Sequence, residues 1–404
     1  MNGSVSDINI SCGLRSLIIF RRLLNEETLK ALIELDERVK GGEDKARILD
    51  SYCNFSALLF SHGYDIGKYL LNIMLTDENI YTEYLLRGVG DGEMLEELLD
   101  RELTILSEIA ACDGGRYRSI AGDITLPLWR SPKKERLDIP TLYRERMSNI
   151  RRTGIGIFAK YHMFILNTEG QLSPIEHPDP QSLEELVGYE RERAKIILNT
   201  EAFLEGKPAN NVLLYGDAGT GKSSTVKAIA NGYADRGLRL VELKKDQLPH
   251  IQPLMDRLAK NPLKFILFID DLTFSSNDAD FCALKATLEG GVAGRGSNIL
   301  IYATSNHRHM IKELASDRVG DEKSVSDKLQ EIVSLSARFG LTVTYSKADK
   351  ALYSEIILGL AQRRGIGMDK DTLIQKAEAF ALRGGGRNPR SAKQFIDMLE
   401  AGVI

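Results

Sequence analysis

Long apolar runs are absent from the sequence, and this absence restricts the classes of protein it can encode. The longest apolar run near the start is "LIIF" at 17–20, and two arginines follow it. A membrane-spanning helix needs about 20 consecutive apolar residues. We therefore expect no signal peptide and no membrane association, and we expect the protein to be cytoplasmic.

Cysteines are few and lie far apart. The four are Cys12, Cys53, Cys112 and Cys282, with no CxxC pair and no histidine at ligand spacing. This pattern argues against a zinc site and against a disulfide framework. We expect buried thiols in a reducing compartment.

Composition excludes little else. A chain of 404 residues is long for a single hydrophobic core, so two or three domains are expected. Hydrophobic content of 43% and charged content of 27% are typical of a globular protein. A net charge of −4 argues against a protein that binds a polyanion over its whole surface.

The apolar pattern changes along the chain from helical to alternating. Segments 25–40 and 91–110 have helical periodicity, whereas 154–175 has β-branched and aromatic residues on both sides of a Glu-Gly turn, which predicts a β-hairpin. Three prolines within 173–181 indicate a boundary. A capping-box pattern of Ser182 and Glu185 predicts that the next helix starts there.

From residue 211 onward, apolar strands alternate with helical stretches. Strands are predicted at 211–215, 238–243, 264–269, 298–303 and 341–345. This alternation is typical of a parallel sheet covered by helices on both faces, and only helical patterns follow. We divide the chain into a mainly helical N-terminal domain of unknown role (1–150), a hairpin and Pro-rich linker (151–181), an α/β core (182–346) and a C-terminal helical lid (347–404).

Basic residues are concentrated between positions 116 and 160. Eleven arginines or lysines face four acidic residues there, and Tyr117, Trp129 and Tyr143 are interleaved. One interpretation is a solvated, loosely structured connector. The alternative is a surface for a phosphate backbone or an acidic partner, because clustered arginines and aromatics suit both contacts.

A glycine-rich turn, "GDAGTGKS" at 216–223, matches the pattern G-x-x-x-x-G-K-[ST] in full. Its glycines let successive backbone N–H groups point at phosphate oxygens, and the following helix adds its positive end. Lys222 is expected to reach the β- and γ-phosphates, and the Ser223 hydroxyl to bind Mg²⁺. The residues expected to contact the nucleotide are Gly216, Asp217, Ala218, Gly219, Thr220, Gly221, Lys222, Ser223 and Ser224.

Polar side chains follow two later strands. "KFILFIDDLTF" (264–274) ends a strand with Asp270, expected to hold Mg²⁺ through water, and Asp271, expected to orient or deprotonate the attacking water. Asn306 follows the strand at 298–303. Because parallel strands end at the same edge of a sheet, Asn306 can reach the γ-phosphate and its water.

Arginines stand at two further positions of interest. Arg338 precedes the last predicted strand, and Arg387 and Arg390 stand where the last helix begins. An arginine at a helix start is unfavourable beside the helix dipole, which indicates that an anion can be present. Ordinary surface positions are the alternative.

These motifs, in this order, resemble those of the AAA+ ATPase superfamily over residues 180–404. "DAGTGKS" is similar to Walker A, "FILFIDD" to Walker B, "ATSN" to sensor one, "SARFG" to the arginine-finger box and "RNPRSAKQF" to sensor two. "LEELVGYERER" (183–193) resembles the segment that packs on adenine in that superfamily. This resemblance implies that Leu186, Val187 and Gly188 contact the nucleotide. The resemblance implies a homo-oligomer with shared nucleotide sites, in which Arg338 acts on a neighbour's nucleotide and Arg390 contacts its own.

Several phrases, among them "LKATLEGG" and "IYATSNHRHMIKE", resemble more closely a bacterial family of predicted AAA+ ATPases, domain of unknown function eight-fifteen. This resemblance extends back through the hairpin. It implies an α/β fold: a three-layer P-loop core with a parallel sheet, a C-terminal helical lid and a mainly helical N-terminal domain ending in a β-hairpin. It implies no established substrate.

One departure from the superfamily concerns the second acid of Walker B. Most members have Asp-Glu there, whereas this chain has Asp270-Asp271, and aspartate is one methylene shorter. We therefore expect a slow or partner-stimulated Mg²⁺-dependent ATPase that converts ATP to ADP and phosphate and remodels or loads an unidentified protein or nucleic acid. A nucleotide switch that rarely cleaves ATP and recruits partners is the alternative, and a small-molecule kinase is the weakest hypothesis.

Overall fold

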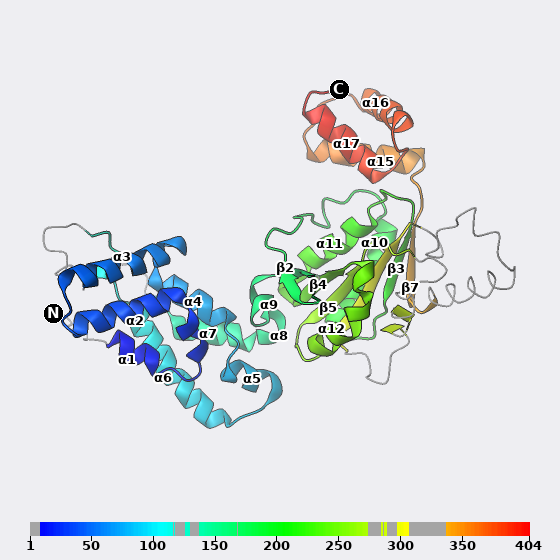
Figure 1. Ribbon diagram of the computed structural model, residues 1–404. Helices are drawn as coiled ribbons and strands as arrows, with labels where there is room; N and C mark the ends of the chain where they lie inside the picture. Colours follow the sequence, from blue (N-terminus) through cyan, green and yellow to red (C-terminus); the bar gives the residue numbers. More distant parts are fainter. Residues whose placement is uncertain are drawn as a thin grey trace. The chain divides into compact units, whose positions relative to one another are not determined.

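The protein divides into two compact units, which are described separately (Figure 1). A computed structural model describes residues 9–115, 117, 126–129, 137–167, 169–273, 284–285, 287–288, 297–306 and 337–404. Unit 1 is Met1–Lys160 and unit 2 is Tyr161–Ile404. Cys282 and the basic residues Arg116, Arg118, Arg130, Lys133, Lys134 and Arg136 lie outside the described residues.

Unit 1 is helical throughout its described residues. Its elements are α1 (Ile10–Arg15), η1 (Arg21–Asn25), α2 (Glu27–Lys40), α3 (Lys45–Ser61), α4 (Ile66–Thr76), α5 (Ile80–Arg87), α6 (Gly92–Ala110), α7 (Ile139–Ser148), α8 (Ile150–Thr153) and α9 (Ile157–Lys160). Aspartates begin four of these helices, where a side-chain oxygen accepts an otherwise unpaired backbone N–H. They are Asp44, Asp65, Asp91 and Asp138, before α3, α4, α6 and α7. Of the described cysteines, Cys12 and Cys53 are exposed, contrary to expectation, and Cys112 is buried.

The aromatic residues of the basic stretch belong to the core of unit 1. Trp129 is 1% exposed and its ring centroid lies 4.8 Å from that of Phe55. Tyr117 is also buried, and Tyr143 packs on Phe20 at 5.2 Å. Rings buried in this way cannot stack on nucleic-acid bases. Both interpretations of this stretch, a solvated connector and a binding surface, are therefore wrong for these three aromatics.

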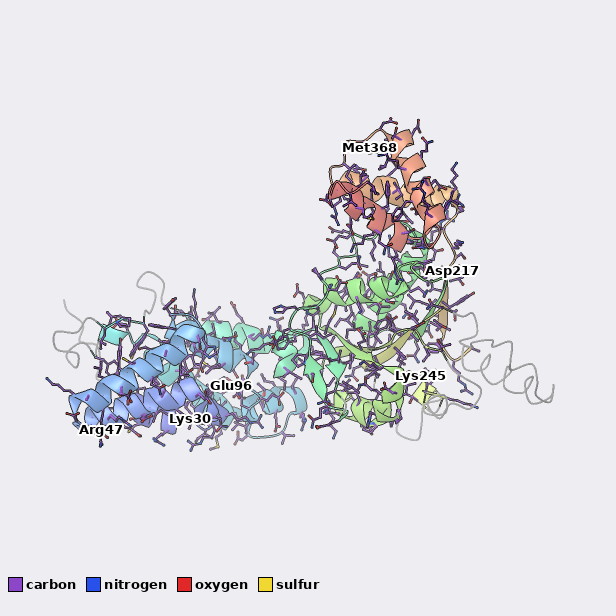
Figure 2. The ribbon with its side chains drawn as sticks, turned by 45° about the horizontal axis from the view of Figure 1, so that its top comes forward. Lys30, Arg47, Glu96, Asp217, Lys245 and Met368 are labelled. Carbon is purple, nitrogen blue, oxygen red and sulfur yellow. The ribbon has the colours of Figure 1, made fainter. Side chains whose placement is uncertain are left out.

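Part of the basic charge in the same stretch is neutralised within unit 1. The Arg144 guanidinium lies 2.9 Å from the Glu96 carboxylate and 2.6 Å from that of Asp100, both on α6 (Glu96 is marked in Figure 2). Arg146 donates to the carbonyl oxygens of Thr153 and Ala159. The guanidinium groups of both arginines are therefore engaged by partners within unit 1.

A buried acid on α6 fixes the segment between α1 and η1. Glu102 is fully buried and accepts hydrogen bonds from the backbone N–H groups of Ile18, Ile19 and Phe20, at 2.6, 3.2 and 3.1 Å. A buried carboxylate is stable only when its oxygens are paired. Here the backbone N–H groups of three residues outside any helix donate the hydrogen bonds that the carboxylate needs.

Unit 2 is built on a seven-stranded sheet of order β2-β1-β4-β5-β6-β3-β7. The strands are β1 (Met163–Leu166), β2 (Leu172–Pro174), β3 (Val212–Gly216), β4 (Leu238–Leu243), β5 (Lys264–Ile269), β6 (Ile299–Ser305) and β7 (Leu341–Tyr345). Every pair is parallel except β1 with β2. The five predicted strands of an α/β core are confirmed, each within a residue or two of its predicted bounds.

The predicted hairpin exists, but it is shorter and belongs to the core sheet. Residues 157–160 are helical, and the strands begin only at Met163. β1 then pairs in parallel with β4, with Met163 opposite Leu240. The hairpin therefore extends the edge of the seven-stranded sheet. The outer strand β2 contains Pro174, which has no backbone N–H to donate. An edge strand tolerates a proline because the side of the strand that faces away from the sheet pairs with no other strand.

Helices cover both faces of this sheet (Figure 1). They are α10 (Glu190–Leu204), α11 (Lys222–Gly232), η3 (Ala234–Arg236), η4 (Lys245–His250) and α12 (Ile251–Leu258). α15 (Lys350–Arg363), α16 (Lys370–Arg383) and α17 (Pro389–Glu400) follow β7 and form the lid. Successive residues of β5 are buried, as expected of a strand covered on both sides. No helix within the described ranges is long and apolar enough to cross a membrane.

Candidate nucleotide-binding site

The loop between β3 and α11 is shaped by glycines with positive φ. Gly216, Gly219 and Gly221 have φ of 138°, 78° and 93°, a region that L-residues with side chains rarely adopt. A Cβ atom at Gly216 would lie 2.0 Å from the carbonyl oxygen of Tyr345 on β7. One at Gly219 would lie 2.9 Å from the Asn388 amide of the lid. The glycines therefore let this loop pass between a strand and the lid.

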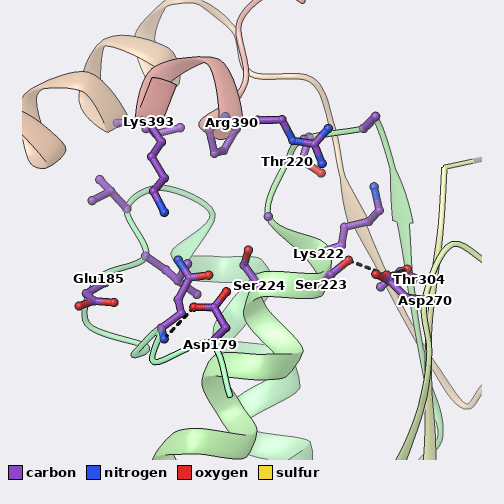
Figure 3. A pocket seen from close by; sticks show the side chains of 18 of the residues that line it. Asp179, Glu185, Thr220, Lys222, Ser223, Ser224, Asp270, Thr304, Arg390 and Lys393 are labelled. Atoms are coloured by element: carbon purple, nitrogen blue, oxygen red, sulfur yellow. Dashed lines mark hydrogen bonds between the residues drawn. The ribbon is translucent and has the colours of Figure 1, made fainter. Parts of the chain in front are cut away.

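A cavity of about 580 Å³ opens beside this loop (Figure 3). Of the residues predicted from the sequence, it is lined by Leu186, Val187, Ala218, Gly219, Thr220, Gly221, Lys222, Ser223, Ser224, Asp270, Asp271, Asn306 and Arg390. Gly188, Gly216, Asp217 and Arg338 do not line it. Asp217 is exposed, and its charge acts on the Lys222 ammonium.

Lys222 is the buried cation of the cavity. Its side chain begins in the first turn of α11, and its ammonium donates to the carbonyl oxygens of Gly216 and Asp217, both at 2.8 Å, and to Asn306 Oδ1 at 2.9 Å. Burial lowers the pKa of Lys222, while three neighbouring aspartates act in the opposite direction. The protein thus holds a desolvated ammonium with oxygen acceptors at the mouth of the loop.

Asp270 connects the loop to two strands. Its Oδ1 accepts hydrogen bonds from the hydroxyls of Ser223, at 2.6 Å, and Thr304, at 2.5 Å. Thr304 also accepts the backbone N–H of Asp271 at 2.8 Å. Sequence reasoning missed Thr304, although its position two residues before Asn306, at the end of a buried strand, could have identified it.

Asp271 and Asn306 form a second pair at the same strand ends. Asn306 Nδ2 donates to Asp271 Oδ1 at 2.7 Å, while Asn306 Oδ1 accepts from Lys222. The arrangement follows from strand order, because β6 lies between β3 and β5 and carries Asn306 at its end. Asp271 has a φ of 52°, a left-handed conformation that costs a non-glycine residue about 1 kcal/mol. Such strain is common at functional sites.

The oxygen donors near the loop fit Mg²⁺. A hydroxyl and two carboxylates, from Ser223, Asp270 and Asp271, line the same end of the cavity. Within the described residues no group of three or more His, Cys, Asp or Glu is placed to hold a metal. Mg²⁺ is usually bound by one or two carboxylates, with the remaining ligands coming from phosphates and water. The donor set matches that mode and does not form an all-protein metal cage.

The opposite end of the cavity is apolar. Leu186 and Val187 face Ile356 and Leu360 of α15, and the sequence did not identify the two lid residues. Gly188, with a φ of 79°, permits this approach, since a Cβ atom there would lie 2.8 Å from Ile356. It therefore shapes the wall without lining it.

The capping box before this loop forms, but it does not start a helix. Ser182 and Glu185 exchange hydrogen bonds at 3.1 and 3.3 Å. The structure continues as a turn, and α10 begins only at Glu190. The prediction of a helix start at Ser182 is therefore wrong, because the chain must first form the wall of the cavity.

The lid brings cations to the loop. Arg390 extends from α17 toward the loop near Thr220 (Figure 3), and its backbone N–H donates to Gly219 O at 3.2 Å. Lys393, one turn further along α17, also lines the cavity and was missed. Arg387 does not line it, because its guanidinium pairs with Glu378 at 2.7 Å within the lid.

Arg338 lies at the other end of the strands. β7 is in register with β3, with Leu341 opposite Val212 and Tyr345 opposite Gly216. Arg338 precedes β7, so it stands beside the start of β3, whereas the loop follows the end of β3. A five-residue strand is about 16 Å long. Arg338 is exposed and does not line the cavity of its own chain.

The fold is of the α/β class, with a glycine-rich loop between β3 and α11. A model of the family described as "Protein of unknown function (DUF815)" matches residues 159–403, and the chain belongs to this family. This confirms the family expected from the sequence.

Two further likenesses are more distant. Over 118 residues, the chain is 32% identical to the large subunit of replication factor C from Staphylothermus marinus. The matched residues are 27% of this chain and 27% of that protein. Two mutants of RuvB from Thermotoga maritima are similar in structure, with TM-scores of 0.38 and 0.37 and identities of 18% and 19%. Each likeness to RuvB covers 55% of this chain and 67% of the other.

Gly216→Ala is expected to disrupt unit 2. Its Cβ atom would meet a backbone oxygen of β7, which cannot move without breaking the sheet edge. Gly206→Ala is a matched control, because Gly206 also has positive φ, 74°, but nothing lies within 4 Å of an added Cβ. We expect the control to cost about 1 kcal/mol and Gly216→Ala to cost several times more, measured by urea unfolding. Equal losses would contradict the close approach of the loop and β7.

Proposed function

We propose that the protein is a Mg²⁺-dependent ATPase that converts ATP to ADP and phosphate. The observation that carries this proposal is the convergence of Lys222, the Ser223–Asp270 pair and the Asp271–Asn306 pair at one end of a cavity. A cation, hard oxygen ligands and a carboxylate near a polar amide are the parts that phosphoryl transfer to water requires.

The loop is suited to the phosphates. Its glycines leave the backbone N–H groups of the turn uncovered, and α11 begins there, so its positive end faces the cavity. Lys222 would exchange its bonds to backbone carbonyls for bonds to phosphate oxygens, which are stronger because both partners are charged. Arg390 and Lys393 would add positive charge from the lid.

Ser223 and Asp270 would hold Mg²⁺, the hydroxyl directly and the carboxylate through water. The bound ion would neutralise charge on the phosphates. Asp271 would accept a proton from the attacking water or orient it, and Asn306 would position the Asp271 carboxylate by the hydrogen bond that it already donates.

We infer that the site is completed by a second copy of the chain. Arg338 stands at the far end of β7 from its own loop, and β7 is the edge strand of the sheet. An arginine supplied by a neighbouring subunit stabilises charge that develops during phosphoryl transfer. The proposed assembly is therefore a homo-oligomer with shared sites, coupled to the remodelling or loading of a protein or nucleic acid.

One observation favours the second candidate, a slow nucleotide switch that recruits partners. The Asp271 side chain is short, and one of its oxygens is already bonded to Asn306. A carboxylate held in this way reaches less far toward the water than glutamate would. Slow turnover in the isolated protein, with intact ATP binding, is the signature of this candidate.

Lys222→Ala is expected to weaken ATP binding by about tenfold or more, because a charge-assisted hydrogen bond contributes about 1.5–3 kcal/mol. Isothermal titration calorimetry measures the change. Lys195→Ala, which removes an exposed cation of α10 outside the cavity, is the control and should leave binding unchanged. Equal ATP affinity in Lys222→Ala and the wild type would contradict the assignment of the phosphate site.

Asp271→Asn is expected to retain ATP binding and to lose turnover by about 10²-fold or more, because the amide cannot accept the proton of water. Asp270→Asn should in addition raise the Mg²⁺ concentration needed for activity. Asp271→Glu restores the missing methylene and should raise the rate. Phosphate release measured under single-turnover conditions compares the variants. Wild-type rates in Asp271→Asn would place the base elsewhere.

Arg338→Ala and Lys222→Ala are each expected to be inactive alone, and mixing them should recover part of the turnover. In a mixed assembly, some sites combine an intact loop from one chain with an intact arginine from its neighbour. The loss in Arg338→Ala should be about 10³-fold or more. Turnover that does not depend on protein concentration, with no recovery on mixing, would contradict the shared site.

A further inference from the structure

The two ends of the cavity differ in their lining. Lys222 lies with Asp270 and Asp271 at the loop end, whereas Asp179 and Glu185 lie at the end that also contains Leu186 and Val187. Arg390 and Lys393 of the lid add positive charge to the lining (Figure 3). The phosphates take the loop end in the proposed function, so the other end, called the acidic end here, is left for the base. A carboxylate accepts hydrogen bonds and donates none when ionised, so the acidic end favours a base that presents an amine.

The segment that carries Asp179 is fixed to the helix of the phosphate loop. Asn231, near the end of α11, donates through Nδ2 to the carbonyl oxygens of Asp179 and Gln181, both at 2.8 Å. Asn231 Oδ1 in turn lies 2.9 Å from His162 Nε2, just before β1. The proline-rich segment is therefore held at two points against the same helix that begins at Lys222. Its distance from the phosphate end is set by the length of α11.

The segment around Leu186 and Gly188, on the other side of the acidic end, is held by Arg193. Arg193 of α10 is 8% exposed, and its guanidinium donates to the carbonyl oxygens of Leu186, at 3.0 Å, and Gly188. It is also 3.0 Å from the Glu190 carboxylate. Backbone carbonyls used in this way cannot turn toward a ligand. The polar contacts available to a base at this end therefore come from the linker side.

Asp179 has capacity to accept a hydrogen bond from a ligand. Its Oδ1 accepts the backbone N–H of Gln181 at 3.2 Å, and no arginine, lysine or histidine among the described residues forms an ion pair with it. Glu185 likewise accepts one backbone N–H, that of Ser182. Asp179 differs from Glu185 because its own carbonyl oxygen is held to α11 by Asn231, so its carboxylate has the better fixed position toward a base.

We propose that Asp179 is a specificity-determining residue that selects a purine carrying an amine at its six position, and that Asn231 is the residue that positions it. The inference rests on the proposed function, since it concerns the base of the same nucleotide. A six-amino purine donates to the carboxylate. A purine with a six-carbonyl group brings one oxygen acceptor against another and leaves both unpaired, which is how a polar site rejects an analogue.

The test compares three nucleotides by calorimetry with the full chain and Mg²⁺: ATP, purine riboside triphosphate, which lacks only the six-amino group, and GTP. Wild-type protein should bind ATP about tenfold more tightly than purine riboside triphosphate, a difference of about 1.4 kcal/mol. In Asp179→Ala this ratio should fall to within about twofold. Glu184→Gln, an exposed acid of the same segment that does not line the cavity, should keep the wild-type ratio.

Two further variants keep the inference testable if Asp179→Ala is unstable. Asp179→Asn keeps the size of the side chain and adds a donor, so GTP should gain about tenfold relative to ATP. Asn231→Ala should reduce the ATP preference while Asp179 is intact, which general destabilisation would not do, since it would weaken all three nucleotides equally. Unfolding midpoints recorded in parallel separate these effects.

Two outcomes would overturn the inference and leave the ATPase proposal intact. One is wild-type protein that binds ATP and purine riboside triphosphate equally. The other is an ATP preference that persists in Asp179→Ala and Asp179→Asn. If none of the three triphosphates binds, the proposed function itself fails and this inference fails with it.

Discussion

The hydrogen bonds of the Lys222 ammonium join the ends of three strands, and the rest of the site depends on them. Lys222 reaches the end of β3 through Gly216 O and the end of β6 through Asn306, and Asn306 continues to Asp271 after β5. A desolvated ammonium would be costly without these acceptors. A phosphate bound as proposed would compete for the same three donors and would change the bonding of Asn306 as well. The groups proposed to bind phosphate and the groups proposed to activate water therefore belong to one hydrogen-bond network.

Features with a local pattern could be predicted from the sequence. The strands of the core are short runs of apolar residues bounded by turns, because both faces of the sheet are covered, and the glycine spacing of the loop dictates its path. Thr304 and Lys393 were missed because their roles depend on tertiary neighbours, Asp270 in the first case and the cavity in the second. Trp129 was misinterpreted for the same reason, since the charges around it suggested a surface while its ring packs on Phe55.

The proline-rich linker shows where composition misleads. Prolines at 174, 178 and 180 disfavour a helix and a central strand, and such a segment resembles a boundary. A single amide, that of Asn231, holds two of its carbonyl oxygens and makes it a wall of the cavity. No pattern within the linker signals this, because the donor lies about fifty residues away. The same prolines then assist the role, since they restrict the linker before it is bound.

The lid contacts the walls of the cavity at both of its ends. Near the phosphates, the backbone N–H of Arg390 donates to Gly219 O. Near the base, α15 packs so closely on the loop before α10 that a Cβ atom at Gly359 would lie 2.7 Å from Val187. A ligand that spans the cavity must therefore meet α15 at one end and α17 at the other. Since α15 and α17 pack on each other within one small domain, a nucleotide bound as proposed would contact that domain at both ends, and loss of its terminal phosphate would remove contacts at the α17 end alone.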